Sequence, residues 1–543
     1  MAWAQNYDPF GAFWLSALVS AVPIATLLLA IALFRIRTPI AAAIGLGAAF
    51  LVAALVYRMP VSMALAAAVL GAANGLLPIG WLVLNILFLY RLTVMRGQFA
   101  SLQAQIATIT PDRRLQLLLI AFGFGAFFEG CAGFGAPVAI TGAMLVGLGF
   151  SPIAASQLAL LANTAPVAFG SGGTPIIALA SASGLPLMDL SAMAGRQLPL
   201  FSFLLPFWLV TAFAGWRGMA QVWPALFVAG IAYAVPQFLV SNLHGPWLVD
   251  VVAALSSIGA TALFLRYWRP RQIWMTEGVA APAGDAVSAT GQPAWRAWLP
   301  WLILSAGVFV WGLPPVRGFL DAWTLRLPMP GLDGLVLRGP PVVSAQQPEA
   351  AVYALAFLST TGTGILVSAV LAGLAMGARP MEMLRCYVGT VRLAVPALAT
   401  IAAMFAIGYL TRYSGADAVL GLALATSGVL YPFFGTLLGW LGVAATGSDT
   451  ASNVLFGNLQ RTSAEHLGIS PVLMAAANST GGVMGKMIDA QSIVVASTAT
   501  GVRGREGEIL RYLMFHSVAL VTLVGLYVLA QAYWWPLSAT VVR

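Results

Sequence analysis

The chain has 543 residues, of which 60% are hydrophobic and 8% are charged, and its mean hydropathy is +0.90. A soluble domain carries about 25% charged residues, so this composition excludes a water-soluble globule. Long uncharged runs recur, and they do not alternate as the roughly 10-residue strands of a membrane barrel do, which predicts an all-α polytopic membrane protein with roughly 12 to 14 transmembrane helices.

The formal net charge of +9 comes mainly from arginines between the apolar runs. This distribution is typical of cytoplasmic loops that face an anionic leaflet, and it argues against nucleic-acid binding. Cys131 and Cys386 lie in or beside apolar runs and predict no disulfide framework, and no pair of the three histidines has metal-ligand spacing. We therefore expect neither a metal nor another cofactor.

The first predicted unit, residues 1–114, holds N-terminal transmembrane helices and ends in an amphipathic surface linker. Its first apolar run, Phe13–Phe34, follows a stretch without Lys or Arg and is longer than the core of a signal peptide, so we expect a retained anchor. Arg35, Arg37 and the arginines within 91–114 predict cytoplasmic loops, which places the N-terminus outside, in the periplasm.

The second unit, residues 115–265, is the first of two predicted repeats, and its apolar helices are interrupted twice. One interruption runs from Glu129 to Pro137 and the other from Gly170 to Pro175. Irregular backbone at membrane depth occurs only where protein or a water-filled cavity covers it. We therefore expect both interruptions to face the interior of the protein.

Three further units complete the chain. Residues 266–298 are rich in Ala, Gly, Pro and Arg and predict a flexible cytoplasmic linker. Residues 299–350 hold one span and an external segment, in which the alternating sequences 324–327 and 335–338 predict a small hairpin. Residues 351–543 form the second predicted repeat, with interrupted helices of its own.

Two sequence patterns occur once in each half of the chain. Gly149–Ile153 matches Gly468–Val472, and the pattern at Asn163, with a glycine seven residues later, recurs at Asn478. Paired Gly- or Pro-interrupted segments in two halves indicate the binding site of a secondary transporter. An interrupted helix exposes unpaired N–H groups at a positive dipole end, where an anion can bind. We expect inverted repeats whose broken helices meet at the membrane midplane.

Lys486 is the only lysine in the chain and lies in a Gly-interrupted polar stretch, so we predict that it binds a substrate anion. A pair with Asp489, one helical turn away, is the alternative and would neutralise the lysine. The other predicted substrate-binding residues are polar residues or glycines of the interruptions, namely Asn163, Thr164, Gly170, Ser171, Ser448, Asn478, Ser479, Thr480, Gly481 and Gln491. Helix capping and close helix packing use the same residue types and are the structural alternatives.

Glu129 and Asp449 are acids within otherwise uncharged stretches. An ionised carboxylate at the centre of a membrane helix costs roughly 2.5–3.5 kcal/mol on insertion scales. A buried acid avoids this cost by pairing or by keeping its proton, and an acid that exchanges between the two states carries a proton. We predict such a coupling role for both residues, with a structural hydrogen bond at a broken helix as the alternative.

The sequence resembles the lactate permease family, the bacterial carriers for lactate and glycolate. The motifs that carry this resemblance are residues 129–141, 162–170, 447–453 and 477–488. The resemblance implies proton-coupled symport, in the uptake direction, of L-lactate and related short 2-hydroxy monocarboxylates such as D-lactate and glycolate across the bacterial inner membrane. Asp489 and Ala490 stand where a small polar residue and proline are expected, and Gly172 and Gly173 make the first break unusually rich in glycine.

Other functions stay open at this point. A sodium-coupled carrier or a carrier of larger carboxylates belongs to the same class, although one Lys and no Arg in the polar stretches favour a single carboxylate. An intramembrane enzyme would use Glu129 and Asp449 as an acid pair, but no nucleophile–base or metal motif accompanies them. A channel would not need two buried acids. We predict a transporter and not an enzyme, with a carboxylate, a proton and membrane lipid as its partners.

Overall fold

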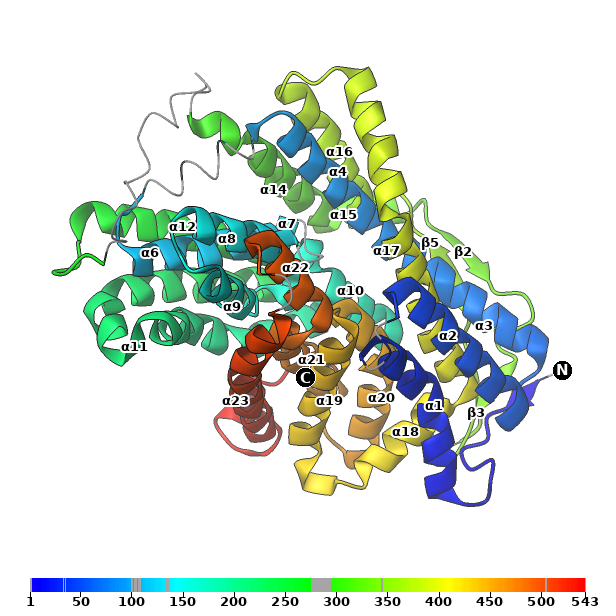
Figure 1. Cartoon of the computed structure of the whole chain (residues 1–543). Helices are drawn as coiled ribbons and strands as arrows, with labels where there is room; N and C mark the ends of the chain where they lie inside the picture. The colour runs from blue at the N-terminus through cyan, green and yellow to red at the C-terminus, as the bar shows by residue number, and fades with distance from the viewer. Residues whose placement is uncertain are drawn as a thin grey trace.

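The computed structural model describes residues 2–542 except for 33, 35, 99–100, 102–104, 106–108, 132–135, 275–293, 343–344 and 503–504. The described chain is mostly helical, with a few short strands near the N-terminus in space (Figure 1). The predicted all-α polytopic fold is confirmed, and the strands are a small addition to it. Residues 99–100, 102–104 and 106–108 of the predicted amphipathic linker, and residues 275–293 of the linker 266–298, lie outside the described residues.

The described first half of the chain is built mainly of helices. They are α1 (Phe13–Ala32), α2 (Thr38–Leu51), η1 (Val52–Val56), α3 (Val61–Asn74), η2 (Gly75–Gly80), α4 (Trp81–Met95), α6 (Arg113–Leu117), η3 (Leu118–Phe124), α7 (Gly125–Cys131), α8 (Ala136–Gly147), α9 (Pro152–Ala162), η4 (Val167–Phe169), α10 (Gly170–Ser183), α11 (Leu187–Leu243) and α12 (Val249–Tyr267). The helix that contains Glu129 continues to Cys131, so Glu129 lies in its last two turns, and residues 132–135 of the predicted break lie outside the described residues.

The second half begins with helices and a strand segment and ends in a long helix. Its elements are η5 (Ala294–Ala297), α14 (Leu299–Gly312), α15 (Pro314–Asp321), β2 (Leu325–Pro328), β3 (Val336–Arg338), β4 (Gln347–Glu349), β5 (Val352–Leu355), α16 (Thr361–Ala375), α17 (Pro380–Ser414), α18 (Ala416–Ala425), η6 (Gly428–Leu430), α19 (Tyr431–Thr446), α20 (Asp449–Leu467), α21 (Pro471–Gly482), η7 (Val483–Ile488), α22 (Ala490–Thr500), α23 (Glu506–Tyr533) and η8 (Leu537–Thr540).

Seven helices of the described chain are long and apolar enough to cross a membrane, or up to ten if each of three sharply bent pairs is one span. The count is lower than the roughly 12 to 14 expected from apolar runs for two reasons. Several apolar helices, such as α8 and α16, are shorter than a crossing. α11 is counted once although its 57 residues form two arms that pack against each other: a Cβ at Gly230 would lie 2.7 Å from the carbonyl oxygen of Phe203, and Ser191 donates to the carbonyl of Ser241. Its kink at Gly215, where φ is 69°, lies between the spans expected at 198–215 and 219–241.

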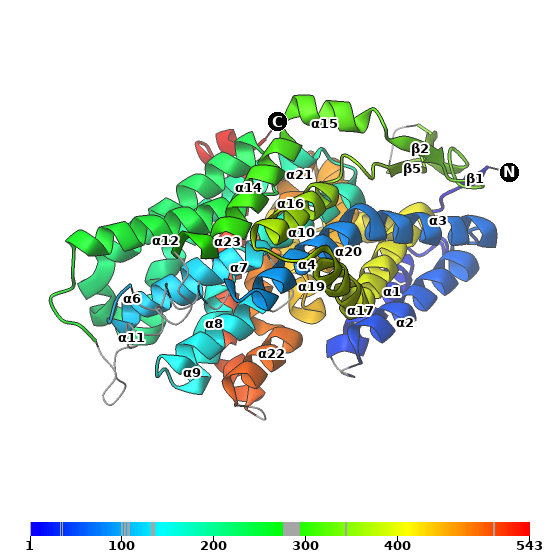
Figure 2. The same cartoon turned by 90° about the horizontal axis from the view of Figure 1, so that it is seen from above.

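The strands pair differently from the sequence prediction. β2 pairs antiparallel with β5, whereas β3 pairs antiparallel with β4 and parallel with the N-terminal strand β1 (Trp3–Ala4). The predicted hairpin between 324–327 and 335–338 is therefore wrong, although both segments contain strands. Each of the two strands pairs with a strand elsewhere in the chain, and the alternating sequence pattern does not specify which strand it pairs with. The pairing places the N-terminus beside this segment (Figure 2).

The repeated Gly-x-Ser-Pro pattern has the same local role in both halves. Ser151 and Ser470 cap α9 and α21, where each hydroxyl accepts a hydrogen bond from the backbone N–H three residues later, and proline follows at the first helical position. In the centre of the molecule α10 packs along α20, and α21 packs against both α19 and α20 (Figure 1). The organisation as two inverted repeats, with the unit boundaries given above, stays a prediction.

Candidate functional site

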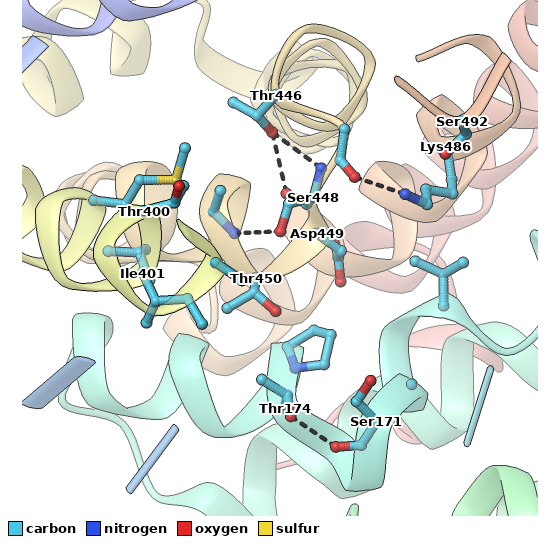
Figure 3. Close-up of a pocket in the computed structure, with 18 of the residues that line it drawn as sticks. Ser171, Thr174, Thr400, Ile401, Thr446, Ser448, Asp449, Thr450, Lys486 and Ser492 are labelled. Carbon is cyan, nitrogen blue, oxygen red and sulfur yellow. Dashed lines mark hydrogen bonds between the residues drawn. The ribbon is translucent and has the colours of Figure 1, made fainter. Parts of the chain in front are cut away.

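A cavity of about 360 Å³ lies where the interrupted helices meet (Figure 3). One wall is polar and comes from α7, the start of α10, the start of α20, η7 and α22. It contains Glu129, Gly170, Ser171, Thr174, Thr446, Gly447, Ser448, Asp449, Thr450, Lys486 and Ser492. The other wall is a largely apolar face of α17, made by Leu393, Pro396, Ala397, Thr400, Ile401, Met404 and Phe405. Since a water molecule occupies roughly 30 Å³, the cavity has room for a small organic anion and several waters.

The first interruption forms the start of α10. Ser171, Gly172 and Gly173 have φ angles of 47°, 68° and 77°, so three successive residues are left-handed. Glycine adopts this conformation at little cost, whereas Ser171 is strained in it. A Cβ at Gly173 would lie 2.6 Å from the Cβ of Pro246, so glycine is also required for space. α9 meets the segment Val167–Ser183, which contains this interruption, at 64°, and Ser171 and Thr174 line the cavity (Figure 3).

The second interruption lies between α19 and α20. Gly447, with φ of 72°, ends α19, and the Ser448 hydroxyl then caps α20 by accepting a hydrogen bond from the N–H of Ala451 at 3.2 Å. Asp449 follows in the first turn, where the positive end of the helix dipole favours a negative charge. Its Oδ2 accepts from the Ser479 hydroxyl at 2.5 Å and from the Asn453 amide at 3.3 Å.

Lys486 lies in the 3₁₀ turn η7, between α21 and α22. Its Nζ donates to the carbonyl of Gly447 at 2.6 Å and lies 3.5 Å from Oδ2 of Asp489, with 9% of the side chain exposed. The Lys486–Asp489 pair considered from the sequence is therefore present. Asp489 also caps α22 through a bond from the N–H of Ser492. Because an ammonium group has three donors, this pairing leaves Lys486 able to bind a ligand in the cavity that it lines.

Glu129 closes the site on the α7 side. It is buried and lines the cavity, and it packs so closely against Gly170 that a Cβ there would lie 2.8 Å from Oε1. Oε2 of Glu129 and Oδ1 of Asp449 have no hydrogen-bond partner among the described residues. Asn163 interacts with Glu129, but neither of its amide atoms forms a hydrogen bond with the described chain. Buried polar atoms without partners are uncommon in proteins, and two of those in the described chain, Oε2 of Glu129 and Oδ1 of Asp449, belong to residues that line this cavity.

Several predicted site residues lie behind the cavity wall. Asn478 bonds Asn453 and Gln460, Thr480 donates to Gln197, and the Thr164 hydroxyl donates back to Leu161. Gly481 lies against the backbone of Thr436, where a Cβ would overlap it. Ser479 reaches the site through Asp449. The side chain of Gln491 lies outside the described residues. These contacts agree with the packing and capping alternatives for Asn478, Thr480, Thr164 and Gly481.

The structure also shows site residues that the sequence analysis missed. Thr174, Thr450 and Ser492 line the polar wall, and the apolar wall comes from a face of α17 without any distinctive motif. Asp250, a further buried acid, lies on α12 against the turn of α7 that contains Glu129. The sequence does contain a signal for Asp250, because this residue is a lone acid at the start of an apolar run, as Glu129 is at the end of one.

The chain is similar to known proteins along nearly its whole length. A family model described as L-lactate permease matches residues 16–535. The chain is 44% identical to an L-lactate permease of Salmonella typhimurium, and the match covers 98% of both chains. It is also 44% identical to the glycolate permease GlcA of Escherichia coli, again over 98% of both chains. Among solved structures, the Alcanivorax borkumensis YdaH transporter matches 86% of this chain and 88% of its own, at 16% identity and a TM-score of 0.44.

Proposed function

The chain belongs to the L-lactate permease family, and on this basis we propose that it carries L-lactate and related short 2-hydroxy monocarboxylates, such as D-lactate and glycolate. The membership and the long apolar helices support a multi-pass transporter rather than an enzyme. Uptake across the bacterial inner membrane is coupled to the entry of a proton. The names of its relatives, L-lactate permease and glycolate permease, support the substrate class.

The charge balance of the cavity carries the proposal of proton coupling. Among the described lining residues, Lys486 faces two carboxyl groups, Glu129 and Asp449, and a third, Asp489, lies beside it. With all three acids ionised, the site would be negative and would repel a monocarboxylate. Once Glu129 and Asp449 hold protons, Lys486 and the dipole ends of the broken helices make the site attractive to an anion. Proton binding and anion binding therefore favour each other.

The two walls suggest how a 2-hydroxy acid lies in the cavity. Lys486 binds the carboxylate, and the hydroxyls and backbone around Ser171 and Ser448 bind the 2-hydroxyl group. The methyl group of lactate faces α17, where Ile401 and Met404 exclude water. Asn163 and Gly170 lie beside Glu129, and Ser479 holds Asp449 through a hydrogen bond.

The remaining predicted site residues lie behind the cavity wall and support it. Asn478, Thr480, Gly481 and Thr164 fix the packing of α21 and the end of α9, and Gln491 belongs to α22 beside the lysine turn.

A proton that enters with a monoanion makes uptake electroneutral, so the site moves no net charge through the membrane field.

The N-terminus and the strand segment beside it face the periplasm, in agreement with the arginine distribution.

The alternative within the same class is coupling to sodium or transport of a larger carboxylate. A second carboxylate would lack a cation among the described lining residues, since Lys486 is the only basic one there. The α17 wall instead suits a short hydrocarbon group. These features favour the short monocarboxylate.

The test is uptake of labelled L-lactate into proteoliposomes at fixed sodium, with an inward proton gradient switched on and off. We expect accumulation that requires the gradient, and competition by glycolate and D-lactate. Protein that is inserted and monodisperse but shows no gradient-dependent uptake of lactate or glycolate would overturn the proposal. Accumulation driven by a sodium gradient at equal pH would establish the alternative.

A further inference from the structure

Asp250 is a buried acid that the proposed site does not yet use. It lies in the first turn of α12, and only 1% of the residue is exposed. Its Oδ1 accepts a hydrogen bond from the Tyr233 hydroxyl of α11 at 3.2 Å, whereas Oδ2 has no partner in the described chain. A buried carboxyl group with one weak donor and one free oxygen is expensive to keep ionised.

Among the described residues, no basic side chain pairs with Asp250. The titratable groups that face it are Tyr233 from α11 and Glu129 and Cys131 from α7. The other packed elements, η3 and α10, contain no ionisable residue in their sequences. Two buried acids elsewhere in the described chain differ, because each has an arginine partner: Asp112 pairs with Arg114 and Glu349 pairs with Arg412.

Asp250 packs against the turn of α7 that contains Glu129. α7 and α12 approach so closely that a Cβ at Gly130, the residue after Glu129, would lie 2.8 Å from the Cβ of Asp250. The two carboxyl groups interact electrostatically, and each has one oxygen without a hydrogen-bond partner among the described residues. Glu129 therefore lines the cavity from a helix turn whose next residue, Gly130, packs against Asp250.

We propose that Asp250 is a second proton-binding site, which exchanges the coupling proton with Glu129. The proton leaves the carboxyl oxygen of Asp250 and bonds to the carboxylate oxygen of Glu129, and the reverse step recharges Asp250. Tyr233 is a positioning residue that fixes the Asp250 carboxyl through Oδ1. This inference rests on the proposed proton coupling, and it adds the group that exchanges protons with Glu129 while substrate occupies the cavity.

The experiment compares two transport modes of Asp250→Asn in proteoliposomes. Exchange of labelled for unlabelled lactate at equal pH needs no net proton transfer, whereas accumulation under a proton gradient does. A one-unit gradient supports about tenfold accumulation for one proton per lactate, because one pH unit is 1.36 kcal/mol. We expect Asp250→Asn to retain exchange and to lose accumulation, so that the ratio falls to about one.

Two further variants make the result specific. Asp417→Asn is the matched control, because Asp417 is also a buried aspartate but lies in α18 with Asn458 as its partner; its accumulation should equal that of the wild type. Tyr233→Phe keeps the ring and removes the donor, and it should retain uptake while changing the pH of half-maximal uptake. If Asp250→Asn does not fold, Tyr233→Phe decides the question.

Three outcomes would overturn the inference. Normal accumulation by Asp250→Asn shows that the proton does not need this group. Loss of exchange together with accumulation, in inserted and monodisperse protein, shows a structural role. An unchanged pH profile in Tyr233→Phe removes the link between Tyr233 and proton exchange. A wild-type protein without gradient-driven uptake would instead refute the proposed coupling itself, and Asp250 with it.

Discussion

Replacing Lys486 by methionine keeps an unbranched side chain of similar length but removes the only cation among the described residues of the cavity wall. A hydrogen bond to a charged partner contributes roughly 1.5–3 kcal/mol. Since 1.4 kcal/mol corresponds to a factor of ten, the KM for L-lactate should rise roughly ten- to a hundredfold. The measurement is the concentration dependence of lactate exchange at equal pH, because that mode does not depend on the proton gradient.

The change has a second consequence, which a paired variant separates from the first. Lys486 lies 3.5 Å from Oδ2 of Asp489, so Lys486→Met leaves that buried carboxylate without its cation. Adding Asp489→Asn removes the unpaired charge and keeps a side-chain oxygen to cap α22. We expect the double variant to recover stability but not affinity.

Two results would refute this reasoning. A KM within about twofold of wild type in the single variant would show that Lys486 contributes little to substrate binding. A twofold change is far smaller than the roughly tenfold change that about 1.5 kcal/mol predicts. Recovery of affinity in the double variant would show that Lys486 serves only to neutralise Asp489. Asp489→Asn alone is the control, and it should leave the lysine free to bind the anion.

Three further predictions concern the break, the strand segment and the apolar wall. Gly173→Ala should lower the melting temperature in detergent, because a left-handed non-glycine residue costs about 1–2 kcal/mol and the space for its Cβ is occupied; an unchanged melting temperature would contradict the observed backbone. Burial alone would raise the pKa of Glu349, but Arg412 and Arg338 outweigh it and hold the pKa below its ordinary value of 4.5. A lowered pKa in the folded state stabilises the protein above pH 4.5 and ceases to do so as the pH falls through the folded value. Glu349→Gln should therefore melt at a lower temperature at pH 7 and lose less stability than wild type on acidification; parallel melting curves would refute this. Ile401→Ala should improve competition by 2-hydroxybutyrate relative to lactate by about fourfold, since a buried CH₂ contributes about 0.8 kcal/mol; an unchanged ratio would show that α17 does not contact the hydrocarbon group.

Local sequence chemistry was sufficient for the elements whose causes are local. The uncharged runs predicted the helices because a bilayer requires apolar segments with internally satisfied backbone. The glycines and proline at 170–175 predicted the break that the structure shows there, with φ angles that only glycine adopts easily. The Ser-Pro pairs at 151 and 470 form matching helix caps. The neighbourhood of Lys486 and Asp489 follows from their spacing within one turn.

Tertiary structure alone decided which polar residues reach the cavity. Asn478 and Ser479 are adjacent in sequence, yet the first bonds other scaffold amides and the second donates to Asp449, because successive residues of a helix point in different directions. The same holds for the strands, whose pattern fixed their existence but not their partners. Asp250 and Glu129 are distant in sequence, and only the close packing of α12 on α7 brings them together. The sequence thus determined which polar and charged groups would be costly to bury in the membrane, because that cost depends on the residue type and on whether the residue lies in an apolar span. Which of these groups share one cavity depends on long-range helix packing, which no local pattern encodes.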